Sequence, residues 1–177
     1  QASAANKLMV ERRLDPCMSE VFTWADLPDA HMKMMANEHK PGNMAVLVQA
    51  PIYPVADEAG QHESYRQFKD GYFLTGGTMG WFTQSYAADP ESARNLPMLG
   101  DCSKAPPTVL CTAGLDPLRD SGRSYAACMV KHGTELTYLE FPGIIHGFFT
   151  MRKAIPSGQA DVEAFIDAIG AALGRQQ

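Results

Sequence analysis

Two continuous apolar runs do most to constrain the fold of this chain. They are NMAVLVQAPIY at residues 43–53 and TVLCTAG at residues 108–114. A strand that is apolar at nearly every position is expected to be covered on both faces, as in a parallel sheet between helices. Pro51 lies inside the first run and has no backbone donor, so we expect it where the sheet needs no hydrogen bond.

Helix-like segments alternate with strand-like ones along the rest of the chain. Strand–helix–strand order at these lengths predicts an α/β fold with about four mainly parallel strands and helices on both faces. We expect strands in the order 7–14, 43–53, 108–114, 135–141, and loop at residues 54–75. We expect helices at 24–39, 78–88, 117–133 (between caps Asp116 and Gly133) and 157–174, the last with Val162, Phe165, Ile166, Ile169 and Leu173 on its apolar side.

The composition is that of a soluble globular protein. The length of 177 residues predicts a single domain spanning residues 1–177. A net charge of -5 with no basic patch excludes a nucleic-acid partner, and no apolar run reaches the roughly 18 residues that a membrane span needs. No signal peptide opens the sequence, which favours a cytoplasmic location.

The four cysteines, Cys17, Cys102, Cys111 and Cys128, are widely spread and form no CxxC pair. Cys111 and Cys128 lie in apolar patterns and are interpreted as buried thiols. This usage is typical of a reducing cytoplasm, so we expect neither a disulfide nor a zinc site. No other metal and no cofactor is expected.

One histidine stands in a setting that is common for a catalytic base. His146 lies in FPGIIHGFF, between glycines and aromatic residues and directly after a strand-like run. Asp116 follows another strand and precedes Pro117 and a helix, so it is either a helix cap or the acid of a nucleophile–histidine–acid triad, and the two roles are compatible. The remaining histidines have no partner pattern and are interpreted as structural or solvent-facing: His31, His39, His62 and His132.

From about Ile52 to its end, the chain resembles the C-terminal half of an α/β-hydrolase of the hormone-sensitive-lipase-like esterase family. The resemblance rests on PIYPV, DGYFLT with MGWF, APPTVLCTAGLDPLRDSGRSYA and FPGIIHGFF. It implies that Asp116 is the triad acid and His146 the triad base, with the Asp116 carboxylate accepting the Nδ1 proton. The family's G-D-S-A-G nucleophile motif and H-G-G-G oxyanion loop do not occur in this sequence.

Residues 1 to about 50 resemble a different family. ERRLDPCMSEVFTWADLPDAHMKMMANEHKPGNMAVLVQAP is similar to the C-terminal tail of a medium-chain reductase of the crotonyl-CoA carboxylase/reductase type. No G-x-G-x-x-G dinucleotide motif is present, so this resemblance implies no hydride transfer. We therefore interpret the chain as a chimera joined near Ala50–Ile52, with a truncated α/β-hydrolase-like fold.

The identity of the nucleophile stays open. Thr78 lies in GGTMG, which mimics G-x-S-x-G, but no buried strand precedes it. Cys17 and Ser19 follow the first expected strand at the edge of the sheet where α/β sites form. Water activated directly by His146 is a further alternative. Ser85, Ser103 and Cys102 are candidates without a motif.

These features favour a carboxylic ester hydrolase that acts on small acyl esters. Five aromatic residues are expected to form the mouth of its site, namely Tyr72, Trp81, Phe82, Phe148 and Phe149. The alternative is an inactive fusion remnant that serves as an oligomerising or binding module. A homo-oligomer is expected in either case, because the truncation turns the strand at 7–14 into an exposed sheet edge.

Overall fold

The computed structural model describes residue 32, residues 48–87 and residues 89–174. The chain divides into two compact units, Gln1–Val46 and Leu47–Gln177, and all of the described residues except Met32 belong to the second unit. The expected strand at 7–14 lies outside the described residues, as does the expected helix at 24–39 apart from the helical Met32. The expected single domain over both units stays a prediction.

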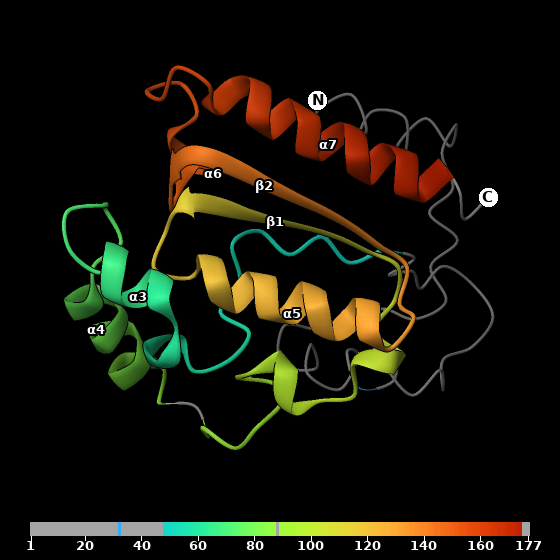
Figure 1. The fold of residues 1–177 in the computed structure, drawn as a ribbon, viewed down its shortest axis with the longest axis horizontal. Helices are drawn as coiled ribbons and strands as arrows, with labels where there is room; N and C mark the ends of the chain where they lie inside the picture. The colour runs from blue at the N-terminus through green and yellow to red at the C-terminus, as the bar shows by residue number, and fades with distance from the viewer. Residues whose placement is uncertain (1–31, 33–47, 88, 175–177) are drawn as a thin grey trace, which may run out of the picture. The chain divides into compact units, whose positions relative to one another are not determined.

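In the described part of residues 48–174, two α-helices precede the first strand, one lies between the two strands and two follow the second strand (Figure 1). The strands are β1 (Thr108–Leu115) and β2 (Leu136–Ile145). The α-helices are α3 (Glu63–Phe68), α4 (Gly76–Tyr86), α5 (Arg119–Lys131), α6 (Phe148–Met151) and α7 (Gly158–Gly174). Single 3₁₀ turns are η2 (Ala59–Gln61), η3 (Pro97–Leu99) and η4 (Cys102–Lys104).

The sheet is parallel. β1 pairs with β2 from Thr108–Leu136 to Ala113–Phe141, and an irregularity then brings Leu115 opposite Ile145. On its other edge, β1 forms parallel bridges with Gln49 and Ile52. The described order 48–53, β1, β2 therefore agrees with the expected order of these three segments.

Pro51 interrupts the edge of this sheet. Gln49 and Tyr53 donate their backbone N–H groups to the carbonyls of Pro107 and Cys111, at 3.0 and 2.7 Å. Pro51 accepts from Cys111 N at 3.0 Å, but it has no N–H to donate in return. The expectation that Pro51 avoids a ladder position is therefore wrong. Its missing donor explains why residues 48–53 form bridges and not a continuous strand.

The two apolar strand faces are covered by different helices, with α7 on one side and α5 on the other (Figure 1). Val109, Cys111 and Ala113 belong to one buried cluster with Phe165 of α7. Leu110 belongs to a second cluster, with Tyr125 and Met129 of α5. Alternate side chains of β1 thus enter two separate cores, which is why the TVLCTAG run is apolar throughout. The predicted α/β class is confirmed.

The expected helices 78–88, 117–133 and 157–174 correspond to α4, α5 and α7. Leu118, and not Asp116, is the N-cap of α5, whereas Gly133 follows the C-cap in the expected left-handed conformation, with φ of +76°. In α7 the expected apolar side is partly wrong, because Ile166 and Leu173 are 55% and 40% exposed. The buried stripe of α7 passes through Ala172 instead.

Residues 54–75 are not all loop, because they contain η2 and α3. α3 buries only one side chain, Ser64. Its hydroxyl donates to the Pro117 carbonyl at 3.0 Å, and its backbone N–H donates to the Asp120 carboxylate at 2.9 Å. Tertiary hydrogen bonds therefore hold this short polar helix, which has no apolar periodicity to reveal it.

The expectation for the cysteines is partly wrong. Cys102 at the start of η4 and the half-buried Cys128 of α5 form a disulfide, because the two segments meet beside β1. Cys111 is a buried free thiol, as expected, and burial raises its pKa to about 12. Among the helices that the structure describes, none is long and apolar enough to cross a membrane.

Candidate active site

His146 and Asp116 meet where β1 and β2 end. Asp116 directly follows Leu115, the last residue of β1, and His146 directly follows Ile145, the last residue of β2. Parallel neighbours present their carboxyl ends at one edge of the sheet. The His146 Nδ1 atom lies 2.8 Å from the Asp116 Oδ2 atom. The structure thus brings the two residues together, while their catalytic roles stay predictions.

Asp116 is fully buried, and both of its carboxylate oxygens accept hydrogen bonds. Oδ1 accepts from the backbone N–H of Leu118 at 2.8 Å, and Oδ2 faces the His146 ring. With the proton on Nδ1, the Nε2 atom of His146 carries the free lone pair that a general base needs. The His146 side chain is 20% exposed, so the ring remains accessible.

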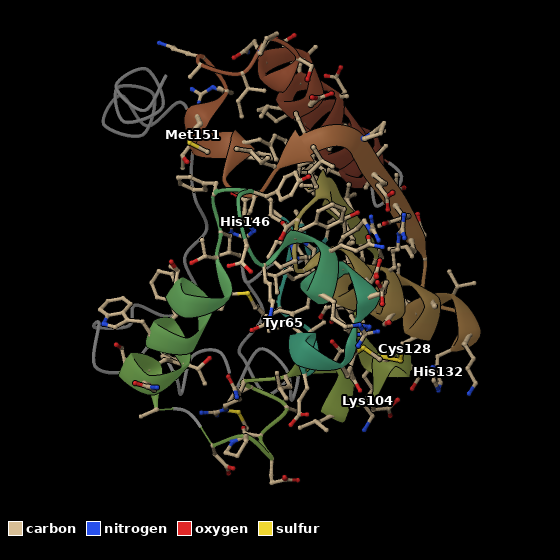
Figure 2. The ribbon with its side chains drawn as sticks, turned by 60° about the vertical axis from the view of Figure 1, so that its left-hand side comes forward. Tyr65, Lys104, Cys128, His132, His146 and Met151 are labelled. Atoms are coloured by element: carbon tan, nitrogen blue, oxygen red, sulfur yellow. A yellow bond between two sulfur atoms is a disulfide. The ribbon has the colours of Figure 1, made fainter. Side chains whose placement is uncertain are left out.

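The His146 ring lines a cavity of about 790 Å³. The walls come from residues 52–60, α3, α4 and the loop that follows α4. Most of the lining is apolar or aromatic, and one wall residue is Tyr65 of α3, which Figure 2 labels together with His146. This volume is typical of a pocket for a small organic molecule.

Tyr53 is a neighbour of His146 that the sequence did not reveal. The two ring centroids are 4.2 Å apart, and Tyr53 also lines the cavity. Burial, followed by the nearby Cys111 and Asp116, raises the pKa of the Tyr53 phenol, so it stays neutral. Its φ of +38° is uncommon for a tyrosine, and no residue pattern announces this conformation.

A second histidine–carboxylate pair lies at the cavity wall. His62 Nε2 is 2.9 and 2.8 Å from the two carboxylate oxygens of Asp57, which lines the cavity. Both side chains are largely buried, at 17% and 14% exposure. Of the two readings that the sequence left open for His62, structural or solvent-facing, the contact with Asp57 favours the structural one. The turn η2 between the two residues is what brings them together, and the sequence shows no signal for it.

The five aromatic residues expected at the mouth of the site have different positions. Phe82 lines the cavity. The Trp81 ring packs against the Phe82 ring, with the two centroids 5.1 Å apart. Phe148 is fully buried in the core, so its expected place at the mouth is wrong. Phe149 packs edge-on against Phe165, and Tyr72 packs against Phe68.

Four of the nucleophile candidates lie in the part of the chain that the structure describes, and the structure supports none of them. Thr78 is exposed in the first turn of α4, where its backbone N–H donates to Thr75 Oγ1 at 3.1 Å, and it does not line the cavity. Cys102 is in the disulfide. Ser85 is exposed on α4, and Ser103 donates to Asp101. Cys17 and Ser19 lie outside the described residues.

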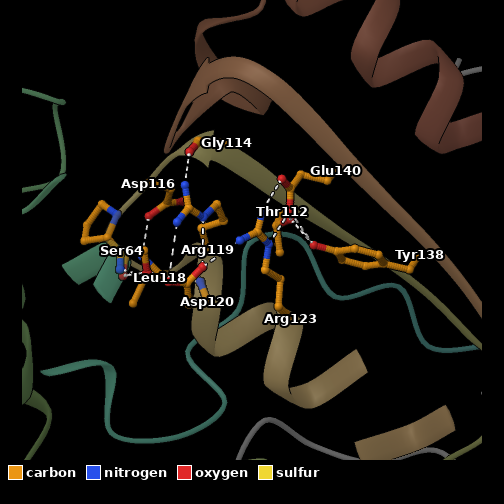
Figure 3. A network of polar contacts seen from close by, with 11 residues as sticks. Ser64, Thr112, Gly114, Asp116, Leu118, Arg119, Asp120, Arg123, Tyr138 and Glu140 are labelled. Carbon is orange, nitrogen blue, oxygen red and sulfur yellow. Dashed lines mark hydrogen bonds and ion pairs between the residues drawn. The ribbon is translucent and has the colours of Figure 1, made fainter. Parts of the chain in front are cut away.

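A network of charged side chains holds the start of α5 against both strands (Figure 3). Arg119 donates to the Gly114 carbonyl at 3.2 Å and to Asp120 at 2.8 Å. Arg123 donates to Asp120 at 3.0 Å and to Glu140 of β2 at 2.7 Å. The bond between Arg119 and the Gly114 carbonyl spans the turn that carries Asp116.

The sequence matches the family described as alpha/beta hydrolase fold over residues 29–150. The match begins before the expected join at Ala50–Ile52. It nevertheless bears out the expected hydrolase part of the chain, and the matched range contains Asp116 and His146.

Two curated hydrolases are similar to most of this chain. Ethyl acetate hydrolase of Pseudomonas putida is 32% identical over 126 residues, covering 69% of this chain and 40% of its own. Carboxylic ester hydrolase LipN of Mycobacterium tuberculosis is 31% identical over 139 residues, covering 76% and 37%. The chain thus spans less than half the length of these relatives.

A separate stretch matches a reductase. Crotonyl-CoA carboxylase/reductase of Cereibacter sphaeroides is 80% identical over 51 residues, which is 29% of this chain and 12% of that enzyme. This short match confirms the expected resemblance to two families and supports the interpretation as a chimera.

Solved structures of esterases have the same fold. An ester hydrolase from the metagenome of Lake Arreo superposes with a TM-score of 0.67 at 33% identity, over 82% of this chain and 46% of its own. A thermostable carboxylesterase from a metagenomic library superposes with a TM-score of 0.70 at 28% identity, over 81% and 49%.

Proposed function

Because this chain belongs to the α/β-hydrolase fold family, we propose that it hydrolyses carboxylic esters with small, uncharged acyl groups. The 2.8 Å contact between His146 Nδ1 and the buried Asp116 carboxylate, at the wall of the cavity, is the observation that supports this proposal most. Similarity to ester hydrolases over most of the chain gives it independent support.

In the proposed reaction, His146 acts as a general base. Its Nε2 atom takes a proton from the attacking group while that group's oxygen or sulfur forms a bond to the acyl carbon. The resulting imidazolium is stabilised by the Asp116 carboxylate. The imidazolium returns the proton to the alkoxide as the ester C–O bond breaks, and the alcohol leaves. If water attacks, the carboxylic acid is the second product; if Cys17 or Ser19 attacks, water hydrolyses the acyl-enzyme in a second round of the same steps.

Water is the attacking group that the described residues favour. Thr78 does not line the cavity, and Cys102 has no free thiol. Cys17 and Ser19 remain alternatives. Because the sequence has no nucleophile motif and no oxyanion loop, we expect a rate far below that of an enzyme with a complete triad. The acceleration that remains over the uncatalysed reaction would come from binding and positioning of the ester.

Hydrolysis of p-nitrophenyl acetate by the pure protein tests the proposal. We expect His146→Ala to lower kcat/KM by about two orders of magnitude or more, since general-base catalysis contributes roughly 10²–10⁴-fold. Histidine side chains outside an active site also react slowly with this activated ester, so His39→Ala, which lies outside the GLDPLRD and IIHGF motifs, serves as the control. Equal rates for the parent protein and His146→Ala would refute the proposed function.

The same comparison separates the nucleophiles. A Cys17→Ala/Ser19→Ala double variant retains the rate if water attacks, and it shows no burst of p-nitrophenol beyond the steady state. A lost rate in this variant assigns the attack to one of these two residues.

The alternative function, an inactive binding module, is favoured by one observation. Trp81, Phe82 and Tyr86 of α4 are 61%, 55% and 72% exposed. An apolar surface of this kind is typical of an interaction site. The alternative requires that the parent protein and His146→Ala have the same background rate.

A further inference from the structure

Cys102, Cys128 and His132 form a cluster that is separate from the cavity; we call it the Cys/His cluster. Both sulfur atoms and one ring nitrogen of His132 lie within 4.8 Å of one another. None of the three residues lines the cavity that contains His146. Figure 2 shows Cys128 and His132 together at the end of α5, with Lys104 nearby.

Helix geometry places two members of the cluster on one face. Cys128 lies in the last turn of α5, and His132 is its C-cap, four residues later. Side chains at i and i+4 are neighbours on a helix surface, the spacing with which helices commonly present two metal ligands. The His132 Nδ1 atom is accordingly 3.7 Å from Cys128 Sγ and 2.8 Å from the Cys128 carbonyl oxygen.

The third member comes from a different element that is firmly held. Cys102 begins η4 and is 4% exposed. Its carbonyl accepts a hydrogen bond from Thr134 Oγ1 at 2.8 Å, and the Asp101 side chain caps η4 by accepting from Ser103 N at 3.0 Å. The Cα atoms of Cys102 and Cys128 are 6.2 Å apart, and these bonds keep them close whether or not the sulfurs are joined.

We propose that reduction of the Cys102–Cys128 disulfide converts the Cys/His cluster into a site for Zn²⁺ or a similar soft divalent cation, with Cys102, Cys128 and His132 as ligands. The disulfide and the metal-bound form exclude each other, because the same sulfur electrons make either bond. This corner of the fold is therefore cross-linked in both states, once covalently and once through the metal.

The chemistry of the conversion is balanced. A dithiol reductant transfers two electrons and two protons to the disulfide and leaves as its own cyclic disulfide. The cation then displaces both thiol protons and binds the two thiolates and a neutral imidazole. Zn–S bonds of about 2.3 Å in a tetrahedral site require the sulfurs to separate to roughly 3.8 Å. Rotation of the two side chains supplies this change.

The surroundings agree with a site that has one open position. His132 is exposed and Cys128 half-buried, so water reaches the cluster and is the expected fourth ligand. Two thiolates and an imidazole select zinc-type cations over Mg²⁺ or Ca²⁺, which prefer oxygen ligands. Nδ1 is the ring nitrogen that lies beside Cys128 Sγ, so it gives up its contact with the Cys128 carbonyl when it binds the cation, and the neutral ring then carries its proton on Nε2.

Cobalt titration tests the proposal, because Co²⁺ substitutes for Zn²⁺ and its thiolate bonds give a charge-transfer absorption band. The protein, in a Cys17→Ser background, is reduced with a water-soluble phosphine, which leaves as the phosphine oxide. We expect one equivalent of Co²⁺ to produce the band and Zn²⁺ to abolish it. The oxidised protein should give no band. The buried Cys111, with a pKa of about 12, does not compete.

Matched variants separate a built site from chance binding to thiols. His132→Ala should weaken Co²⁺ binding by at least about 10-fold, whereas Lys131→Ala, the exposed neighbour on α5, should leave it unchanged. Cys128→Ser should remove the band. Circular dichroism checks the fold of each variant; if the reduced protein has lost structure, stoichiometric Zn²⁺ should restore it.

Three results would each overturn the proposal. The first is a reduced protein that gives no charge-transfer band and gains no structure with Zn²⁺. The second is a His132→Ala variant that binds Co²⁺ as tightly as its parent. The third is a band of equal strength in the oxidised protein.

Discussion

At the scale of single residues, the two oxygens of Asp116 have different tasks. Oδ1 holds the turn after β1 through Leu118 N, and Oδ2 orients His146. A carboxylate accepts at both positions, which an amide does not, since it offers one oxygen and one NH₂ group. An amide at this position can therefore keep the bond from Leu118 and lose the one to His146, which separates the structural role of Asp116 from its proposed catalytic role.

We expect Asp116→Asn to keep the fold and to reduce the esterase activity. If the amide oxygen accepts from Leu118, its NH₂ group faces His146 Nδ1 and forces the ring proton onto Nε2, which removes the base. The kcat for p-nitrophenyl acetate should fall by about two orders of magnitude or more with KM nearly unchanged. An unchanged kcat in a variant with the parent's melting temperature would contradict the triad role.

Glu140 makes a contribution to stability that depends on pH. Its hydrogen bonds from Arg123 lower the pKa of this carboxyl, against an opposing effect of burial. A carboxyl whose folded pKa is lowered stabilises the fold above its unfolded pKa, and this stabilisation is lost as the pH falls through the folded pKa.

The variant Glu140→Gln should therefore reduce the free energy of unfolding near neutral pH by about 1 kcal/mol, a small value because Arg123 is half-exposed. The difference from the parent should shrink as the pH falls below the usual range of a glutamate pKa. Urea unfolding at neutral and acidic pH measures both effects. Glu91→Gln, an exposed acid, is the control, and a pH-independent difference for Glu140→Gln would argue against the ion pair.

At the scale of elements, the packing of α5 on β1 depends on Gly122. A Cβ atom at this position would collide with the Thr112 side chain of β1. Gly122→Ala should therefore destabilise the protein by about 1–3 kcal/mol, although alanine favours a helix by about 1 kcal/mol. In Gly170→Ala the new methyl group enters open space on α7, so this control should be neutral or stabilising. Thermal unfolding compares the two, and equal shifts would contradict close packing at Gly122.

The elements that the sequence predicts well are those whose pattern is local. The TVLCTAG run predicted β1 with two covered faces, because its side chains enter two cores in alternation. The contact between Asp116 and His146 was expected from the resemblance to the esterase family, and the structure brings the two residues together where β1 and β2 end. Asp57 with His62, Tyr53 beside His146 and the Cys102–Cys128 disulfide were not predicted. Each depends on how distant turns pack, which leaves no periodic pattern in the sequence.

At the scale of the whole molecule, helix α4 has little of its surface covered by the rest of the described chain. No residue of α4 is buried, and three of its aromatic side chains are more than half exposed. The chain also spans less than half the length of its hydrolase relatives. An apolar surface of this kind is usually covered by another chain or segment.

We expect the protein to associate into dimers or larger assemblies, most simply about a two-fold axis, through the face of α4 that carries Trp81. Light scattering across a dilution series should give at least twice the mass of one chain at high concentration. Trp81→Arg should shift the mass towards that of a monomer, because a charge replaces the exposed indole. Ile166→Arg, at an equally exposed position on α7, should not. A monomer mass at every concentration, with Trp81 unchanged, would show that one chain tolerates this surface in water. Dissociation by both variants alike would show that α4 is not the specific contact.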